Sequence, residues 1–309
     1  MSESVALIFG PVVEPVTLND ARLQLGFGPI DDSTREASQI VNDKVRRFII
    51  TARQDAENYL QRALITQTWI LRRDSFPGHN LRYDWNGYPE IVLPKPPFQS
   101  VQRFTYIDVA GFPRRLFQDT TFGTNPFNPE YSYQLERGSE TQPGRLLPAF
   151  AQPWPPTRMV PANVIVQFRC GYGGPITVSI EAGSAALTVT GGSKLGPAGR
   201  TTAFDRDDAP LLPGETGLPI KIPGAGANAD PLETFIASVD PETGAATLAD
   251  AASTTVTGAT AWAGEQVPSV IIDAIKMLVQ FYYDHGGCED VPLPRVVESL
   301  LLPYRNLVA

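Results

Sequence analysis

The residues of this chain that could do chemistry are few and widely spaced. Its two histidines are His79, in a Pro-Gly-His-Asn turn, and His285, at the end of a predicted helix, and both are interpreted as surface or capping residues. Five residues in one short stretch are of types that bind metals: Asp284, His285, Cys288, Glu289 and Asp290. Their spacing fits no structural zinc pattern. The sequence therefore predicts neither a metal site nor a cofactor.

Two glycine-rich segments resemble phosphate-binding loops, and both are rejected. Gly191-Gly192-Ser193-Lys194 lacks the GxxxxGK[ST] spacing and a following helix, and Gly224-Ala225-Gly226-Ala227 is interpreted as a turn in a β context. The adjacent acids Asp207 and Asp208 lie in a loop rich in Pro and Gly, where such pairs are usually solvated. No catalytic constellation is left, so the sequence predicts a protein that is not an enzyme.

Composition indicates a globular chain with more than one domain. Of the 309 residues, 42% are hydrophobic and 19% are charged, which is enough to bury a large core. No apolar run approaches the roughly 20 residues that cross a membrane, and the N-terminus lacks signal-peptide features, so we expect assembly in the cytoplasm and no membrane partner. The only cysteines, Cys170 and Cys288, are predicted to be two reduced structural thiols, although a single bridge stays open.

The net charge of −8 is unevenly distributed. Residues 175–264 hold 10 acidic and 4 basic residues, a net charge of −6, and the rest of the chain holds 23 and 21, a net charge of −2. Proteins that grip DNA need clustered Lys and Arg to displace phosphate counterions, and no such cluster is present in the sequence. If DNA is a partner, we expect it to pass along the protein without specific binding.

A long helix is the clearest predicted element, in the stretch from Arg35 to Trp69. Its apolar or small residues recur at three- and four-residue spacing: Ile40, Val41, Val45, Phe48, Ile49, Ala52, Ala56, Tyr59, Leu60 and Ala63. Such a helix would be roughly 40 Å long, the length of a domain's spine or of a subunit contact. Thr17 is predicted to cap a short helix before it, and a last helix is predicted from Pro268 to Gly286-Gly287.

Strand patterns fill most of the remaining chain. The predicted strands before residue 175 are Thr66 to Asp74, Ile91 to Leu93, Val101 to Val109, Arg114 to Gln118, Tyr131 to Leu135, Gly144 to Leu147 and Asn163 to Arg169. Residues 175–264 show only short strand candidates, and they predict a small all-β domain of sandwich or barrel type. The predicted fold class is α+β, with a long spine helix, short β-hairpins, a C-terminal helix and this inserted domain.

The order of several motifs resembles the head-tail connector proteins of tailed bacteriophages, also called adaptor or head-completion proteins. The motifs that carry the resemblance are Glu14-Pro15-Val16-Thr17-Leu18, Ala52-Arg53, Ala56-Glu57, Arg62-Ala63-Leu64-Ile65-Thr66-Gln67-Thr68-Trp69, Ile91-Val92-Leu93-Pro94, Pro97, Ser100-Val101, Tyr106-Ile107-Asp108, Trp154-Pro155, Val166-Gln167-Phe168, Gly171-Tyr172-Gly173 and Tyr282-Tyr283. They cover residues 11–174 and 265–309. The chain departs from the family pattern at residues 175–264, which are interpreted as an insertion between the two parts of a connector core, 1–174 and 265–309.

The resemblance implies a structural protein of the virion, located at the head-tail junction. It implies a homo-oligomeric ring, typically a dodecamer, docked beneath the portal protein and contacting the next neck or tail-completion protein. Arg46, Arg47 and Arg53 on the long helix are candidates for a contact with a neighbouring subunit or with the DNA channel. The tail from Val291 to Ala309 is a candidate portal-docking arm, carried by Leu300, Leu301, Tyr304 and Arg305, and the alternative is that it packs on its own core.

The inserted domain leaves a second function open. It would contact capsid, neck fibres or a host surface, and the alternative reading is a carbohydrate- or host-surface-binding protein. Sugar-binding platforms usually stack on clustered aromatic rings, whereas Trp262 is the only Trp in the insert. The sequence therefore favours the connector reading.

Overall fold

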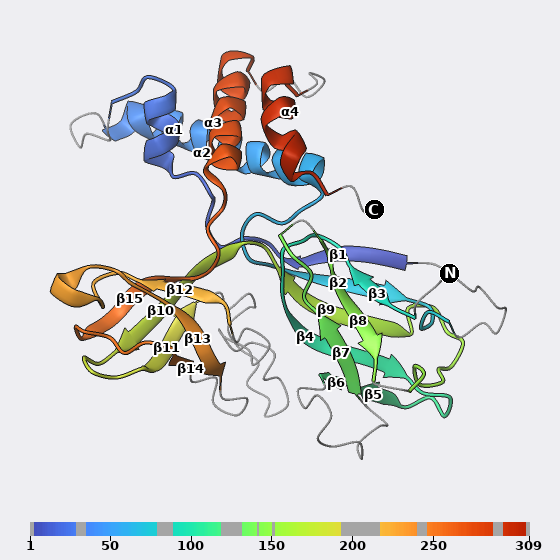
Figure 1. Cartoon of the computed structure of the whole chain (residues 1–309). Helices are drawn as coiled ribbons and strands as arrows, with labels where there is room; N and C mark the ends of the chain where they lie inside the picture. The colour runs from blue at the N-terminus through green and yellow to red at the C-terminus, as the bar shows by residue number, and fades with distance from the viewer. Residues whose placement is uncertain are drawn as a thin grey trace.

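The computed structural model describes residues 3–28, 35–78, 89–118, 132–140, 142–149, 152–192, 217–239, 246–286 and 293–306. These residues form three lobes joined by a few crossing segments (Figure 1). One lobe is helical, one contains two β-sheets and one is a β-barrel, and each has its own hydrophobic core. None of the helices in these ranges is long and apolar enough to cross a membrane.

The helical lobe contains the long predicted helix and packs three shorter helices against it. Its elements are α1 (Leu18–Gln24), α2 (Arg35–Leu60), α3 (Ser269–Asp284), α4 (Arg295–Leu301) and the 3-10 helix η6 (Leu302–Tyr304). Thr17 caps α1 as predicted, because its hydroxyl oxygen accepts a hydrogen bond from the Asp20 amide at 3.1 Å. The predicted apolar stripe of α2 faces α3 over most of its length, but Ile40 near its start is 77% exposed. The cap proposed at residues 31–33 lies outside the described residues.

The β-lobe packs two sheets around an aromatic core. Its five-stranded sheet has the order β1 (Glu3–Phe9), β2 (Gln67–Arg73), β9 (Val164–Cys170), β4 (Phe98–Ile107) and β5 (Pro113–Arg115). Its four-stranded sheet has the order β3 (Ile91–Leu93), β8 (Gly144–Pro148), β7 (Ser132–Glu136) and β6 (Phe117–Gln118). Phe76 and Trp154 stack at a ring distance of 4.8 Å in this core, beside Phe104. The sequence did not predict β1, which pairs with β2 far along the chain.

The described residues of the insert form a closed six-stranded barrel. In barrel order its strands are β10 (Gly173–Ile180), β11 (Ala186–Gly192), β14 (Ala246–Leu248), β13 (Leu232–Val239), β12 (Pro219–Ile222) and β15 (Val256–Gly264), and the 3-10 turn η5 (Ala227–Ala229) follows β12. Closure leaves no free edge in the barrel. Gly173 pairs with Gly264, so the barrel begins and ends at one point of the fold.

Candidate functional site at the junction of three lobes

Segments of all three lobes meet where α2 ends and β9 passes into β10. Ile65, between α2 and β2, forms a parallel bridge with Gly173, the first residue of the barrel. The Thr66 amide donates to the Gly173 carbonyl at 3.0 Å, and the Tyr172 amide donates to the Leu64 carbonyl at 3.3 Å. Because Gly173 also pairs with Gly264, these short main-chain contacts connect the helical lobe, the β-lobe and the barrel.

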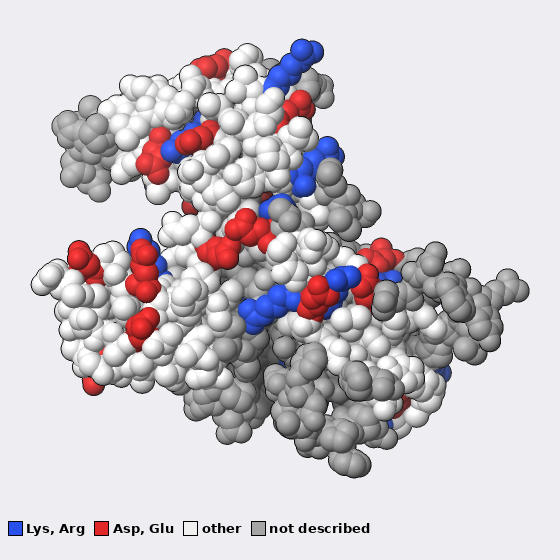
Figure 2. All heavy atoms as spheres, viewed as in Figure 1, with Lys and Arg blue, Asp and Glu red and all other residues white. Residues whose placement is uncertain are grey.

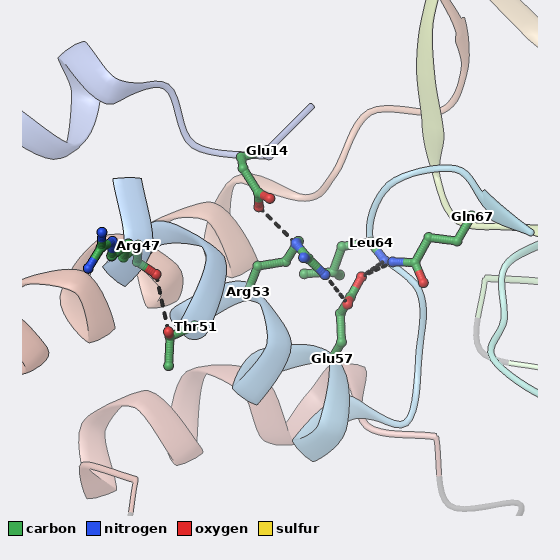
Figure 3. A network of polar contacts seen from close by, with 7 residues as sticks. All are labelled: Glu14, Arg47, Thr51, Arg53, Glu57, Leu64 and Gln67. Carbon is green, nitrogen blue, oxygen red and sulfur yellow. Dashed lines mark hydrogen bonds and ion pairs between the residues drawn. The ribbon is translucent and has the colours of Figure 1, made fainter. Parts of the chain in front are cut away.

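Glu57 is the centre of a buried polar network at this junction (Figure 3). Its Oε2 accepts from Arg53 Nη1 at 2.6 Å, and Arg53 Nε donates to Glu14 at 2.8 Å. Its Oε1 accepts from the Leu64 amide at 2.9 Å and from the Gln67 side-chain amide at 2.5 Å. One carboxylate therefore joins the last turns of α2 to the connecting loop and to the first residue of β2.

The electrostatics of Glu57 follow from its burial. Burial raises the pKa of the Glu57 carboxyl above its ordinary value, whereas Arg53 and the hydrogen bonds from Leu64 and Gln67 act in the opposite direction. The Arg53 side chain is 7% exposed and contacts two carboxylates. Paired groups of this kind are costly to leave half-satisfied, so the network holds these segments in one arrangement.

Two glycines allow the main chains of the lobes to approach closely. Gly171 has a φ of +119°, and a Cβ atom there would lie 2.4 Å from the Ile65 carbonyl oxygen. Gly264 has a φ of +98°, and a Cβ atom there would lie 2.4 Å from the Tyr172 carbonyl oxygen. Both positions combine a left-handed conformation with a backbone neighbour that leaves no room for a side chain. The junction therefore depends on glycine at both points.

Side chains add further links around the junction. Gln99 donates from Nε2 to the Thr66 hydroxyl at 2.9 Å and to the Gly171 carbonyl at 2.8 Å. Tyr282 on α3 donates its hydroxyl hydrogen to Asp55 on α2 at 2.5 Å. Trp262 at the end of the barrel donates to the Glu265 carbonyl at 3.1 Å and packs against the core of the helical lobe. Each link connects segments that are distant in the sequence.

Arg62 is buried in the same region but is only partly compensated. Its side chain is among the most deeply buried of the described residues, and its Nη1 donates to the Tyr172 hydroxyl at 3.1 Å. Its Nε and Nη2 atoms have no hydrogen-bond partner in the described part of the chain. A buried cation with unpaired donors is costly. We therefore assign the stability of the junction to Glu57 and the two glycines, and not to Arg62.

The candidate contact residues on the long helix separate into two groups. Arg46 and Arg47 lie on the exposed face of α2, where Arg46 pairs with Asp43 at 3.1 Å, and the Arg47 side chain points away from the Glu57 network (Figure 3). Arg53 instead lies inside the subunit, 5% exposed and bound to Glu14 and Glu57. The prediction that Arg53 contacts a neighbour or the channel is therefore wrong.

The candidate docking arm packs on its own subunit. Leu301 is fully buried in the core of the helical lobe, and Leu300 and Tyr304 are partly buried against it. The Arg305 guanidinium lies 5.1 Å from the centre of the Tyr59 ring, and the next residue bonds through its amide to the end of α2. The prediction of a free portal-docking arm is corrected, because an apolar face of α4 is satisfied within the chain. Residues 307–309 lie outside the described residues.

The rejected chemical motifs are only partly described. His285 follows α3, and its Nδ1 lies 2.8 Å from the Phe281 carbonyl oxygen, at the helix end as expected. Gly224 has a φ of +78° in a turn after β12. His79, Asp207, Asp208 and residues 287–290 lie outside the described ranges. Within those ranges no group of three or more His, Cys, Asp or Glu side chains could hold a metal ion.

Cys170 at the end of β9 provides a test of the packed junction. Its side chain is fully buried, and burial followed by the Glu57 charge raises the pKa of the thiol well above its ordinary value. We expect a thiol reagent to label Cys170 at least about a hundredfold more slowly in the native protein than in denaturant, because little thiolate forms. A Cys288→Ser variant leaves one thiol to follow, and equal rates in the two conditions would contradict the packing described.

Sequence reasoning missed the role of Glu57, Gln67 and Gly171 as one site. All three lie in motifs that carry the family resemblance, but nothing in the sequence states that these motifs touch. The spacing of Arg53 and Glu57, four residues apart on one helix face, was a usable signal of an ion pair. Its burial was not, because Leu64 and Gly171 approach it only in the folded chain.

Comparison with known proteins gives partial structural likeness and no sequence match. No protein-family model matches the chain, and no curated protein is significantly similar to it. A chain from the neck of an empty gene transfer agent particle, computed with C6 symmetry, is 13% identical with a TM-score of 0.48, covering 99% of this chain and 97% of that chain. A chain from the virion of a native gene transfer agent particle is 12% identical with a TM-score of 0.48, covering 99% and 96%.

Proposed function

We propose that this chain is a structural subunit of a phage-like virion, located in the neck between head and tail. Copies of the chain form a ring beneath the portal protein, extend the DNA channel and offer a platform to the next neck or tail-completion protein. In this proposal the helical lobe and the β-lobe make the body of the ring. The barrel is an added domain that contacts capsid or fibres.

The observation that carries the proposal is the convergence of the family motifs at one buried site. Glu14, Arg53, Glu57 and Gln67 come from separate motifs of the resemblance, and they form one hydrogen-bonded network. Gly171, from another motif, closes on the loop between α2 and β2. Scattered chance matches would have no reason to meet in space. Their contact supports the reading that the resemblance reflects a shared framework.

A fixed arrangement of lobes is what a ring subunit requires. A ring closes only when each subunit presents its two contact surfaces at a constant angle. The junction supplies such an arrangement, because Glu57 links α2 to β2 and Gly173 links the connecting loop to the barrel. A chain of loosely tethered domains would instead form assemblies of variable curvature.

The surface charge supports a channel that DNA traverses without being held. On the face shown in Figure 2, acidic and basic side chains lie singly or in small groups, and no broad basic patch gathers among the described residues. Tight DNA binding depends on many Lys or Arg contacts with phosphate. A mixed or acidic wall repels phosphate and favours passage.

The alternative of sugar binding through the barrel loses its strongest candidate residue. The Trp262 ring packs against the core of the helical lobe and its indole N–H is bonded to Glu265, so it is not a free stacking platform. Among the described barrel residues, Phe235 at 55% exposure is the large aromatic side chain that faces solvent. One exposed ring is less than such platforms use, which favours the structural role.

Charge reversal on α2 tests its role in assembly. We expect Arg46→Glu with Arg47→Glu to weaken ring assembly while changing the free energy of unfolding by less than about 1 kcal/mol, because the Arg46–Asp43 pair is exposed. Sedimentation velocity measures assembly, and thermal melting measures stability. Arg295→Glu, at an exposed position of α4, is the matched control. Equal losses of assembly and stability would count against a contact at this face.

Negative-stain microscopy of the purified chain, with and without portal protein, tests the proposed function. We expect rings in the mixture, and either rings or monomers in the protein alone. Failure to associate with portal under any condition would remove the proposal.

A further inference from the structure

The first strand leaves one edge of the five-stranded sheet open. β1 pairs with β2 on one side, and the described residues place no strand on its other side (Figure 1). All of its residues from Glu3 to Ile8 are exposed or partly exposed, including Val5 at 38%, Leu7 at 48% and Ile8 at 36%. Unpaired main-chain groups along such a strand are a template for another strand.

The apolar face of the sheet continues past the layer that covers it. Val5 lies opposite Leu71, which is fully buried, and Leu7 lies opposite Trp69, which packs on the same core. Paired residues of neighbouring strands point to the same face of a sheet. Val5 and Leu7 therefore point to the core face, yet each stays more than a third exposed. A further packed layer over β1 would bury them.

The edge also lacks the features that proteins use to block strand addition. Within Glu3–Phe9 there is no proline and no lysine, and the one charged residue, Glu3, stands at the beginning. Its described pairing contains a single irregularity, between Leu7 and Phe9. Long apolar edges without charges or proline normally aggregate unless a partner covers them. β1 is thus built as an interface.

The opposite edge of the same sheet carries a second exposed apolar group. β5 is the last strand there, and it leads from a hairpin whose Val109 and Phe112 are 64% and 61% exposed. Phe117, just after β5, is 58% exposed, and Met159 beside the same hairpin is 93% exposed. Arg114 and Arg115 give this edge a basic character, whereas the one charge on β1 is acidic. The two edges are complementary in apolar surface and in charge.

We propose that the β1 edge of one copy binds the β5 edge of the next copy, so that the sheets of neighbouring subunits join head to tail. This inference rests on the proposed ring and names its contact. Two different surfaces at opposite ends of one sheet form a heterologous interface, and such an interface closes into a ring when its rotation permits. Val5 and Leu7 then pack against Phe112 and the rest of the hairpin.

The occupant of β1 is a second copy because the chain itself carries both halves of the contact. A pairing of β1 with β1 would be two-fold symmetric, would end at a dimer and would leave the hairpin of Phe112 exposed. A strand from the portal would also leave that hairpin without a partner. Only the head-to-tail arrangement covers both exposed groups with one repeated contact.

Cysteine trapping distinguishes these arrangements. In a Cys288→Ser background, with Cys170 buried, Leu7→Cys and Phe112→Cys are introduced singly and together, and the assembled protein is oxidised. We expect the double variant to give a ladder of covalent multimers, and each single variant to stay monomeric on a non-reducing gel. Covalent dimers from Leu7→Cys alone would show the two-fold arrangement and overturn the proposal. A double variant without multimers, from protein that forms rings, would overturn it as well.

Charged residues placed on the edge provide the second test. We expect Val5→Lys with Leu7→Lys to raise the protein concentration needed for half-assembly at least tenfold, with thermal melting used to confirm folding. Leu23→Lys is the control, because Leu23 is 64% exposed on α1, away from both edges. Rings that form equally well with the edge variant would refute the β1 contact and leave the proposed function standing. Absence of rings and of portal binding in the unmodified protein would instead refute the proposed function.

Discussion

Replacing Glu57 with alanine is expected to lower the free energy of unfolding by about 3–5 kcal/mol, the range for removing one partner of a buried ion pair. The change leaves Arg53 with Glu14 alone, and it removes the acceptor for the Leu64 amide and the Gln67 side chain. Glu57→Gln keeps a carbonyl oxygen in place, so we expect a smaller loss. Chemical denaturation measures both variants.

The control for this prediction lies on the same helix. Asp43 pairs with Arg46 at 3.1 Å, but both side chains are more than 60% exposed, and exposed pairs contribute about 0–1 kcal/mol. We therefore expect Asp43→Ala to change stability by less than about 1 kcal/mol. Comparable losses from Glu57→Ala and Asp43→Ala would show that the buried network does not hold the junction.

Replacing Gly171 with alanine is expected to cost roughly 3 kcal/mol or more, or to prevent folding, because two effects act at once. The left-handed conformation opposes any side chain, and the new Cβ atom would meet the Ile65 carbonyl oxygen at 2.4 Å and the Thr66 nitrogen at 2.8 Å. These atoms belong to the main-chain contacts that join the lobes. Relief of the clash would lengthen those contacts.

Gly183→Ala separates the two effects. Gly183 has a φ of +78°, and nothing lies within 4 Å of the position of a Cβ atom, so we expect only the conformational cost of about 1–2 kcal/mol. The difference between the two variants, measured by denaturant unfolding, isolates the close approach at the junction. Equal effects would mean that Gly171 is needed for its backbone conformation alone.

Local patterns predicted the helices well, because helix formation depends on residues three and four positions apart. The apolar stripe placed Val45, Ile49 and Ala56 on the inner face of α2, where they are buried. The same stripe included Ile40, which is exposed because the start of α2 extends past the helices that pack on its middle. Periodicity therefore identifies a face but not how far its cover extends.

Pairing between distant segments could not be predicted from local patterns. The run from Val5 to Phe9 is apolar enough to suggest a strand, but its partner β2 comes after both N-terminal helices. The same limit applies to Arg53, interpreted as a surface residue because Glu14 and the Leu64 loop are distant in sequence. The tail was ambiguous for a similar reason, since Leu301 finds its core only when α3 and α2 are in place.

Native mass spectrometry of the chain bound to portal protein tests the central claim most directly, because it counts the subunits. The ring proposal predicts one defined complex in which a fixed number of copies of this chain accompanies the portal ring. The junction variants Glu57→Ala and Gly171→Ala are expected to lose that defined number. A complex holding a single copy, or a chain that stays monomeric beside the portal, would contradict the account.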